Sequence, residues 1–442
     1  MGPIKIKTVQ IDSIQFKGST ITRRGNESLE ILGDNFYVSN LVVDNSLPNK
    51  IELDDLEFSV RGFLESDSNK TFQTGFDGMR IKKNQLTLQN YFLRASNRNK
   101  TANTSISTSQ LILHNLSIPA LLSGQLKADE LDLISPNVRL QLAGKNAGKK
   151  LNPLREIQRI IRRKLQIETI RVFDADLQIT ASGAKKPLVS STSFSAIISS
   201  NSVLRAGTLE ELFDGKNRLE MPQLALRLKN FNVDLTNAVY EDNDLRASQA
   251  IGNTSENKIR FDLRNIHVQD INAAGIIEGK DTNWVRLIEL GSGKVFLGHL
   301  SGKNNTSAKT RIPQEMIRNI RTGKLDLIFE QPGLTVNTSL DSIAVDSLRY
   351  QNQQWTWFHY YLAGQKLKLN QDKLELSIGP YLVSSEQTNL QELQIKASGN
   401  RFDLAGRIPG VQLSGSPASL KDPLAGIKKA VLTSPDIKLV LK

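Results

Sequence analysis

The stretch that decides the fold is GQLKADELDLISPNVRL, residues 124–140. On both sides of Pro136 apolar residues alternate with polar ones, and this period of two is typical of half-buried β-strands. Proline has no backbone N–H to donate, so Pro136 marks a strand start, a strand edge or a bulge. The apolar residues before Gly124 complete a unit made of a short helix or apolar turn, a strand, a proline and a second strand.

The same unit recurs elsewhere in the chain. Its end is repeated as SPDIKL at residues 434–439, and looser copies surround Pro332 and Pro222. Repetition of this kind indicates an array of similar units that share a core.

A second repeat places an acidic residue beside a hydroxyl residue inside an alternating run. VQIDSIQF at residues 9–16 matches LQIETIRV at 165–172 at every position by residue type, and VDSLRY at 345–350 is a third copy. Two adjacent polar residues shift the apolar positions by one. We therefore expect a bulge or tight bend that returns the next apolar residue to the same face.

A third pattern reads apolar, any residue, Asn or Asp, apolar, any residue, apolar. It occurs at residues 53–58, 113–118, 228–233 and 263–268. The apolar phase again slips, here at a residue type that tolerates unusual backbone angles. Bends inside strands build curved sheets.

Together these patterns predict a mostly β fold: an elongated, curved antiparallel β-sheet, shaped as a gutter or groove and built from repeats, with a few short helices. The predicted repeat units are 4–142, 153–336 and 340–442. The clearest helix is expected over residues 153–164, where Asn152 and Pro153 precede an apolar face. Shorter helices are expected at 209–213, 313–320 and 423–430.

The composition restricts the partners of the chain. A net charge of +12 and a pI of about 9.6 favour anionic partners such as phospholipid headgroups, lipopolysaccharide or nucleic acid. Nucleic acid is not expected, because no segment interleaves basic residues with stacking aromatics. The absence of Cys excludes disulfides and thiolate metal sites, and is common in bacterial periplasmic proteins.

No group of residues suggests catalysis. His114, His267, His299 and His359 lie far apart in the sequence, and none has the spacing of metal ligands. There is no Gly-x-Ser-x-Gly elbow, and no Gly-Lys pair is followed by the Ser or Thr of a phosphate loop. We therefore expect structural histidines and a non-enzymatic protein with no catalytic residues, no metal and no cofactor.

Residues 124–140 and the bent-strand motifs around them resemble the AsmA-like and TamB-like envelope proteins of Gram-negative bacteria. The similarity is one of pattern and spans most of the chain. It implies a long β-sheet folded like a gutter and anchored in the inner membrane, with an apolar inner face that conducts or holds lipid between the membranes. Eukaryotic bridge-like lipid-transfer proteins have a similar architecture.

The resemblance also implies a periplasmic or envelope location, phospholipid or another acyl lipid as partner, and contact with other envelope proteins. The chain departs from the family because it lacks the N-terminal membrane helix. A strand is expected from Ile4 and another up to Lys442, so the chain is expected to be a segment of a longer, inner-membrane-anchored protein.

The apolar positions of the repeats are the candidates for the lipid groove. They are Val9, Ile11, Ile14, Phe16, Leu131, Leu133, Val138, Leu140, Leu165, Ile167, Ile170, Val172, Val345, Leu348 and Tyr350. Alternation alone does not distinguish an open groove from a closed core. The alternative functions are therefore a structural β protein with a closed core, or a scaffold that assembles outer-membrane proteins through its sheet edges.

Two further segments are candidates for contacts. Residues 145–164 carry eight basic side chains and a single acidic one, and the helix expected there is first interpreted as a solvated cap on the sheet. Contact with an anionic membrane surface is the second interpretation, which can coexist with the first, and its candidate residues are Arg155, Arg159, Arg162 and Arg163. The aromatic run WTWFHYY at residues 355–361 is expected to be strand core, with a groove lining or membrane-facing rim as the alternative.

Overall fold

The computed structural model describes residues 4–441 with internal gaps. The segments outside the described residues are 12–13, 23–24, 45–49, 53–54, 67–70, 97–102, 123–124, 142–164, 181–183, 185, 200–216, 229–230, 255–257, 272–284, 299–316, 347–348, 352–353, 357–358 and 416–426. The chain divides into two compact units, residues 1–227 and 228–442, and each is described by itself. The predicted repeat units remain a prediction; the junction at 336–340 lies inside one strand of the second unit.

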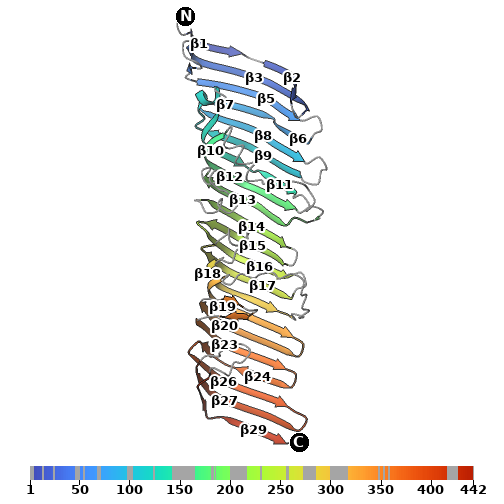
Figure 1. Cartoon of the computed structure of the whole chain (residues 1–442), viewed down its shortest axis with the longest axis vertical. Helices are drawn as coiled ribbons and strands as arrows, with labels where there is room; N and C mark the ends of the chain where they lie inside the picture. The colour runs from blue at the N-terminus through green and yellow to red at the C-terminus, as the bar shows by residue number, and fades with distance from the viewer. Residues whose placement is uncertain are drawn as a thin grey trace. The chain divides into compact units, whose positions relative to one another are not determined.

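The first unit is a β-sheet whose strands follow one another in chain order (Figure 1). Strand β3 (Gly25–Asp44) pairs on one edge with β1 (Ile4–Ile11) and β2 (Ile14–Thr22), and on the other with β4 (Lys50–Glu52) and β5 (Asp55–Ser66). The sheet continues through β6 (Phe72–Phe76) with β7 (Gly78–Lys82), β8 (Gln85–Ser96), β9 (Asn103–His114), β10 (Leu126–Ile134) with β11 (Asn137–Gln141), β12 (Leu165–Thr180), β13 (Val189–Ser199) and β14 (Arg218–Leu228).

The second unit is built in the same way. Its strands are β15 (Phe231–Glu241), β16 (Asp244–Thr254), β17 (Ile259–Gln269), β18 (Val285–Leu297), β19 (Ile317–Gln331), β20 (Leu334–Asp346), β23 (His359–Gln371), β24 (Leu374–Ile378) with β25 (Tyr381–Ser384), β26 (Gln387–Ser398), β27 (Phe402–Ser414), and β28 (Lys429–Thr433) with β29 (Asp436–Leu441). A separate ribbon pairs β21 (Arg349–Gln351) with β22 (Gln354–Thr356). The mostly β prediction is confirmed.

The sheets are mixed rather than purely antiparallel. β10 and β11 both pair parallel with β12, and β18 pairs parallel with β19. Residues 142–164 and 298–316 connect these parallel strands, and both are long enough for the crossover that parallel pairing requires. The antiparallel prediction is therefore wrong at these strands, because alternation looks the same in both kinds of ladder.

The repeat at residues 124–140 has the predicted structure. The helix α1 (Ile118–Leu122) precedes β10, and Ser135 and Pro136 separate β10 from β11, which pair with the same two neighbours. Ser135 has a positive φ of 47°, and Ser434, before Pro435 between β28 and β29, has a φ of 44°. The proline motif is therefore one long strand that bends in its middle.

Such bends lie opposite one another in successive strands, and we call each row of them a bend line. In the second unit the bend line contains Asn237 with a φ of 49° and Asn265 with a φ of 52°. Gly291 lies opposite Asn265 and Gly323 opposite Gly291, and the line continues across the sheet through Pro380, Glu392 and Pro435. In the first unit it contains Asp77, Asn90, Ser135, Asp174 and Ser193. Aligned bends curve each sheet, as predicted.

The sequence pattern with a central Asn or Asp predicted some of these bends and not others. Asn265 lies inside β17 at the bend line, whereas Asn115, with a φ of 54°, follows the end of β9. In the acidic-hydroxyl repeat, Ile167 is buried and Ile170 packs against the same core, so the apolar phase shifts between them as predicted. In the third copy β20 ends at Asp346, and the next two residues, 347–348, lie outside the described residues, so the predicted bend there stays a prediction.

Two helix predictions are wrong where the structure describes them. Residues 317–320 of the predicted helix 313–320 begin β19, where Ile317 pairs with Val285, and residues 429–430 begin β28. Pairing with a neighbouring strand overrides local helical spacing at both places. The predicted helices at 153–164 and 209–213 lie outside the described residues. In the part of the chain that is described, no helix is long and apolar enough to cross a membrane.

Candidate functional site

One face of the first unit carries a connected set of apolar side chains. Seven of them are buried in one cluster: Ile81, Leu86, Leu113, Leu116, Ile118, Ala128 and Ile167. A second cluster contains Val172, Ala175 and Ala196, and Ile170 packs against both. The apolar face therefore runs without interruption from β7 to β14, and α1 packs onto it through Ile118 and Leu121.

Several predicted groove residues lie on this face. Ile167 and Val172 are buried, and Leu131, Leu133 and Ile170 pack against the same clusters. Val138 and Leu140 are half-buried and pair with Leu177 and Ile179, which alternate in phase with buried Ala175 on β12.

The remaining predicted groove residues are less fully described. Val345 is half-buried on β20, two residues from Ile343 in the apolar cluster of the second unit. Val9 and Ile11 lie on β1, Ile14 and Phe16 on β2, Leu165 on β12 and Tyr350 on β21, and the structure describes only their backbone. Leu348 lies outside the described residues, as do Arg155, Arg159, Arg162 and Arg163.

The second unit has an equivalent face, which extends from β17 to β27. Its buried members are Leu325, Leu340, Ile378, Tyr381, Leu393, Ile408 and Val411. A larger number of apolar neighbours, including Leu362, Ile395 and Leu413, are only partly buried against them. In a closed sandwich these positions would be covered by a second sheet, whereas within the described residues they are only partly buried.

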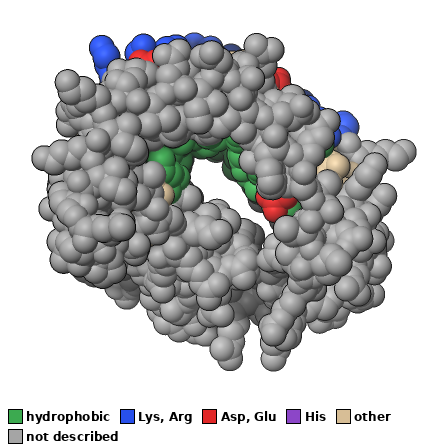
Figure 2. All heavy atoms as spheres, turned by 90° about the horizontal axis from the view of Figure 1, so that it is seen from above, with side chains coloured by type: hydrophobic (Ala, Val, Ile, Leu, Met, Phe, Trp, Pro, Cys, Tyr) green, Lys and Arg blue, Asp and Glu red, His purple; other side chains and the backbone are tan. Residues whose placement is uncertain are grey.

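Apolar and charged side chains occupy opposite sides of the curved sheet. In Figure 2 the coloured hydrophobic side chains line a hollow, and the coloured Lys and Arg side chains lie on the outer side. The exposed strand residues Lys366 and Lys368 alternate with Leu367, which packs against the apolar cluster. The alternation seen in the sequence therefore separates an apolar inner face from a charged outer face.

The charged face of the first unit is held by an ion-pair network. Arg171 Nε donates to Asp132 Oδ1 at 2.6 Å, Arg171 Nη2 contacts Glu130 at 2.7 Å, and His114 Nε2 lies 2.9 Å from Asp132 Oδ2. Burial raises the pKa of the Asp132 carboxyl, but the hydrogen bonds from Arg171 and His114 outweigh it, so the net pKa lies below its usual value. The hydrogen bond to Asp132 raises the pKa of the Arg171 guanidinium.

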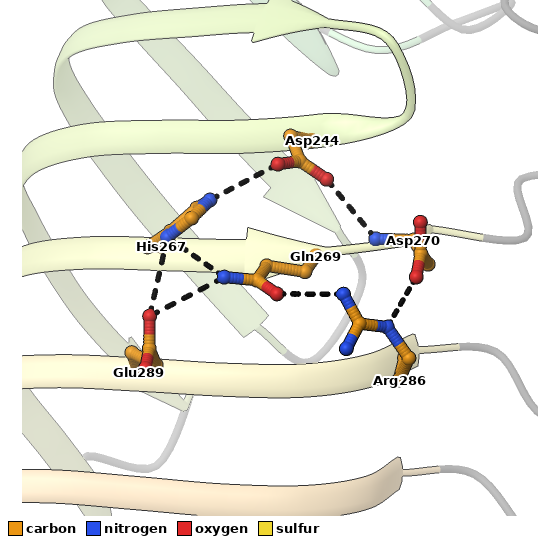
Figure 3. Close-up of polar contacts among 6 residues, drawn as sticks. All are labelled: Asp244, His267, Gln269, Asp270, Arg286 and Glu289. Atoms are coloured by element: carbon orange, nitrogen blue, oxygen red, sulfur yellow. Dashed lines mark hydrogen bonds and ion pairs between the residues drawn. The ribbon is translucent and has the colours of Figure 1, made fainter.

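A similar network surrounds His267 in the second unit (Figure 3). Its Nε2 lies 3.1 Å from Asp244 Oδ2 and its Nδ1 lies 3.2 Å from Glu289 Oε2. Arg286 bonds Gln269 and Asp270 at the end of the same strand. Both ring nitrogens of His267 are thus occupied in linking three neighbouring strands, which supports the predicted structural role of this histidine.

The described residues offer little for catalysis or metal binding. Among them, no group of three or more His, Asp or Glu side chains could hold a metal ion. His359 Nδ1 lies 3.4 Å from Ser385 Oγ, and His299 lies outside the described residues. The absence of enzymatic activity remains a prediction.

Sequence reasoning missed a groove on the charged face of the second unit. The groove has a volume of about 880 Å³ and crosses β15 to β23. The sequence hints at this groove only through Ile251 and Ile328, two apolar residues at positions where the alternation calls for polar ones. They are 48% and 39% exposed. Strand register, which the sequence does not give, is needed to bring them together.

Comparison of the chain with protein-family models, with curated proteins and with solved structures found no match.

Proposed function

We propose that this protein is a non-enzymatic lipid-binding or lipid-transport module of the bacterial cell envelope, and that acyl chains lie along its apolar faces. The observation that carries the proposal is the uninterrupted apolar face of each unit, which crosses many strands and stays partly exposed within the described residues. Such a face matches an alkyl chain, which needs continuous apolar contact and no polar chemistry.

The energy available is sufficient for binding. Each buried methylene contributes about 0.8 kcal/mol, so a chain of about 14 carbons gains on the order of 11 kcal/mol before ordering costs. The lining is mainly aliphatic, as in the partly buried row of Leu362, Leu390 and Ile395. We propose phospholipid or another acyl lipid as the partner on these grounds.

The cellular location is part of the same proposal. A cysteine-free chain fits the oxidising periplasm of a Gram-negative bacterium, and its net positive charge fits anionic envelope surfaces. The resemblance of the bent-strand repeats to the AsmA-like and TamB-like envelope proteins supports this location, an inner-membrane anchor and a role in outer-membrane biogenesis.

The test uses adjacent residues of β26 that point to opposite faces. Ile395 packs against the apolar cluster, whereas Gln394 is exposed on the charged face. We expect the unchanged protein to carry phospholipid through purification, detected by native mass spectrometry and by lipid extraction. Ile395→Glu should lower the bound lipid severalfold because a carboxylate in an apolar contact is strongly disfavoured. Gln394→Glu introduces the same charge and should leave lipid binding unchanged.

Repeated lipid-free preparations that take up no phospholipid from vesicles would contradict the proposal. They would favour a structural protein, or an outer-membrane-assembly scaffold, whose apolar face is simply a closed core. A circular dichroism melt of both variants separates loss of binding from loss of folding.

A further inference from the structure

The groove on the charged face of the second unit has two walls and a floor. Residues paired across neighbouring strands share a face, so ladder register identifies the walls. One wall is the row Asn253, Arg260, Phe296, Ile328, Asn337 and Lys368, and the other is Asp234, Ile251, Asp262, Lys294, Asp326, Ser339 and Lys366. The floor is formed by the residues between the rows, such as Gly252 and Val295.

Apolar side chains interrupt the charged walls of the groove. Phe296 and Ile328 lie opposite each other on β18 and β19, Ile251 lies on β16, and both isoleucines are exposed although they stand on the charged face. The guanidinium of Arg260 covers the ring of Phe296, with Cζ 4.1 Å from its centroid. Strands lie about 4.8 Å apart, so the three strand spacings from Lys366 and Lys368 on β23 to Phe296 on β18 are about 15 Å long and fit a single alkyl chain of medium length.

The charges of the groove are unevenly placed. Lys366 and Lys368 stand together on β23, and with Lys294 they are exposed and form no ion pair among the described residues. The carboxylates nearer the middle are already engaged: Asp326 accepts a hydrogen bond from Ser339 at 2.7 Å, and Asp262 accepts one from Gln249 at 2.7 Å. One end of the groove therefore attracts an anion, and the apolar pair Ile328 and Phe296, which attracts a hydrocarbon, begins two strands away on β19.

We propose that this groove binds a single-chain amphiphile with an anionic headgroup, such as a fatty acid or a lysophospholipid. The headgroup lies between Lys366 and Lys368, and the chain extends over Ile328 to Phe296. This site does not rest on the proposed function, because it lies on the opposite face of the sheet.

The test measures binding of dodecyl phosphate to the full chain by isothermal titration calorimetry, with the probe kept monomeric. Lys366→Gln with Lys368→Gln should weaken binding about tenfold or more, since each lysine supplies a charge-assisted contact to the headgroup. The matched control is Lys324→Gln with Lys396→Gln. Both of these lysines are exposed on the same face outside the groove, and their loss should change the affinity less than twofold.

Three other probes separate the contribution of the headgroup from that of the alkyl chain. Inorganic phosphate and dodecyltrimethylammonium should bind far more weakly than dodecyl phosphate, because the first lacks the chain and the second lacks the anion. Tighter binding of dodecyl phosphate than of dodecanoate assigns the site to lysophospholipids, and the reverse order assigns it to fatty acids. Unchanged affinity in the Lys366 and Lys368 double variant, or an equal loss in the control, would overturn the proposal.

Discussion

At Gly364, the absence of a side chain allows β23 and β25 to pack together. A Cβ atom there would lie 2.5 Å from Tyr381 Cζ and 2.6 Å from the backbone oxygen of Ser339. Tyr381 is buried in the apolar cluster, and its hydroxyl bonds Thr338, so the ring has little freedom to move. A larger residue at position 364 would have to displace backbone or a buried ring.

We therefore predict that Gly364→Ala lowers the free energy of unfolding by about 1–3 kcal/mol, the usual cost of overpacking. Denaturant unfolding monitored by circular dichroism measures this. Gly406→Ala is the matched control in the same unit, since its Cβ would come no closer than 3.4 Å to any neighbour. Equal stability of the two variants would contradict this prediction, because it would mean that the Tyr381 ring moves aside without a measurable cost.

Asp132 makes the stability of the first unit sensitive to acid. Its pKa is lower in the folded protein than the usual 3.8, because Arg171 and His114 hold the carboxylate against the cost of burial. A carboxyl with a depressed folded-state pKa stabilises the fold above its unfolded pKa and loses that contribution as the pH falls through the folded value.

Asp132→Asn should cost about 1–3 kcal/mol of unfolding free energy at pH 7, since it removes a charged hydrogen-bond partner from a nearly buried network. The difference from the unchanged protein should shrink as the pH falls below about 4. Denaturant titrations at pH 7 and pH 3.5 measure both values. Glu168→Gln, at an exposed position on β12, is the control, and a pH-independent difference for Asp132→Asn would refute the ionic explanation.

At the scale of strands, the bend lines determine the curvature of each sheet. Residues in the left-handed region of backbone space lie on these lines: Asn90 on β8 and Asp174 on β12 in the first unit, and Asn237 on β15 and Asn265 on β17 in the second. Polar side chains satisfy backbone groups near them, as when Ser248 Oγ donates to the oxygen of Thr236 at 2.9 Å. Each strand therefore changes direction at this line, and the shift in alternation there keeps its apolar side chains on the same face.

Asn265 tests this account of curvature. Asn265→Val should lower the unfolding free energy by about 1–3 kcal/mol, because a β-branched residue tolerates positive φ poorly. Asn265→Gly should cost much less, since glycine adopts that conformation without strain. The measurement is denaturant unfolding of both variants. A valine variant as stable as the glycine variant would show that the backbone can straighten at this point.

The sequence predicted strands, the proline unit and the existence of bends, because all three depend on local phase. Leu131, Leu133, Ile167, Ile170 and Val172 were placed on one face for the same reason. The parallel pairings and the groove beside Lys366 could not be predicted, since they depend on which residues of distant strands lie opposite each other. Local helical spacing at residues 317–320 was misleading, because pairing with β18 decides that segment.

At the scale of the whole chain, the two sides of the sheet in each unit differ in chemistry: the outer side is charged and the inner side is apolar. Charged networks around Asp132 and His267 join strands on the outer side. The inner side is aliphatic and only partly buried at positions such as Ile395. The proposed lipid-binding function requires that partial exposure, whereas a closed structural core would require the same residues to be covered.

Site-specific photo-cross-linking along β26 tests the central claim most directly. A photoreactive residue is placed in turn at Leu393, Gln394, Ile395 and Lys396, in cells of a Gram-negative host. The account predicts lipid adducts, detected by mass spectrometry, at Leu393 and Ile395 on the apolar face and none at Gln394 and Lys396 on the charged face. No lipid adduct at either apolar position, or equal adducts on both faces, would contradict it.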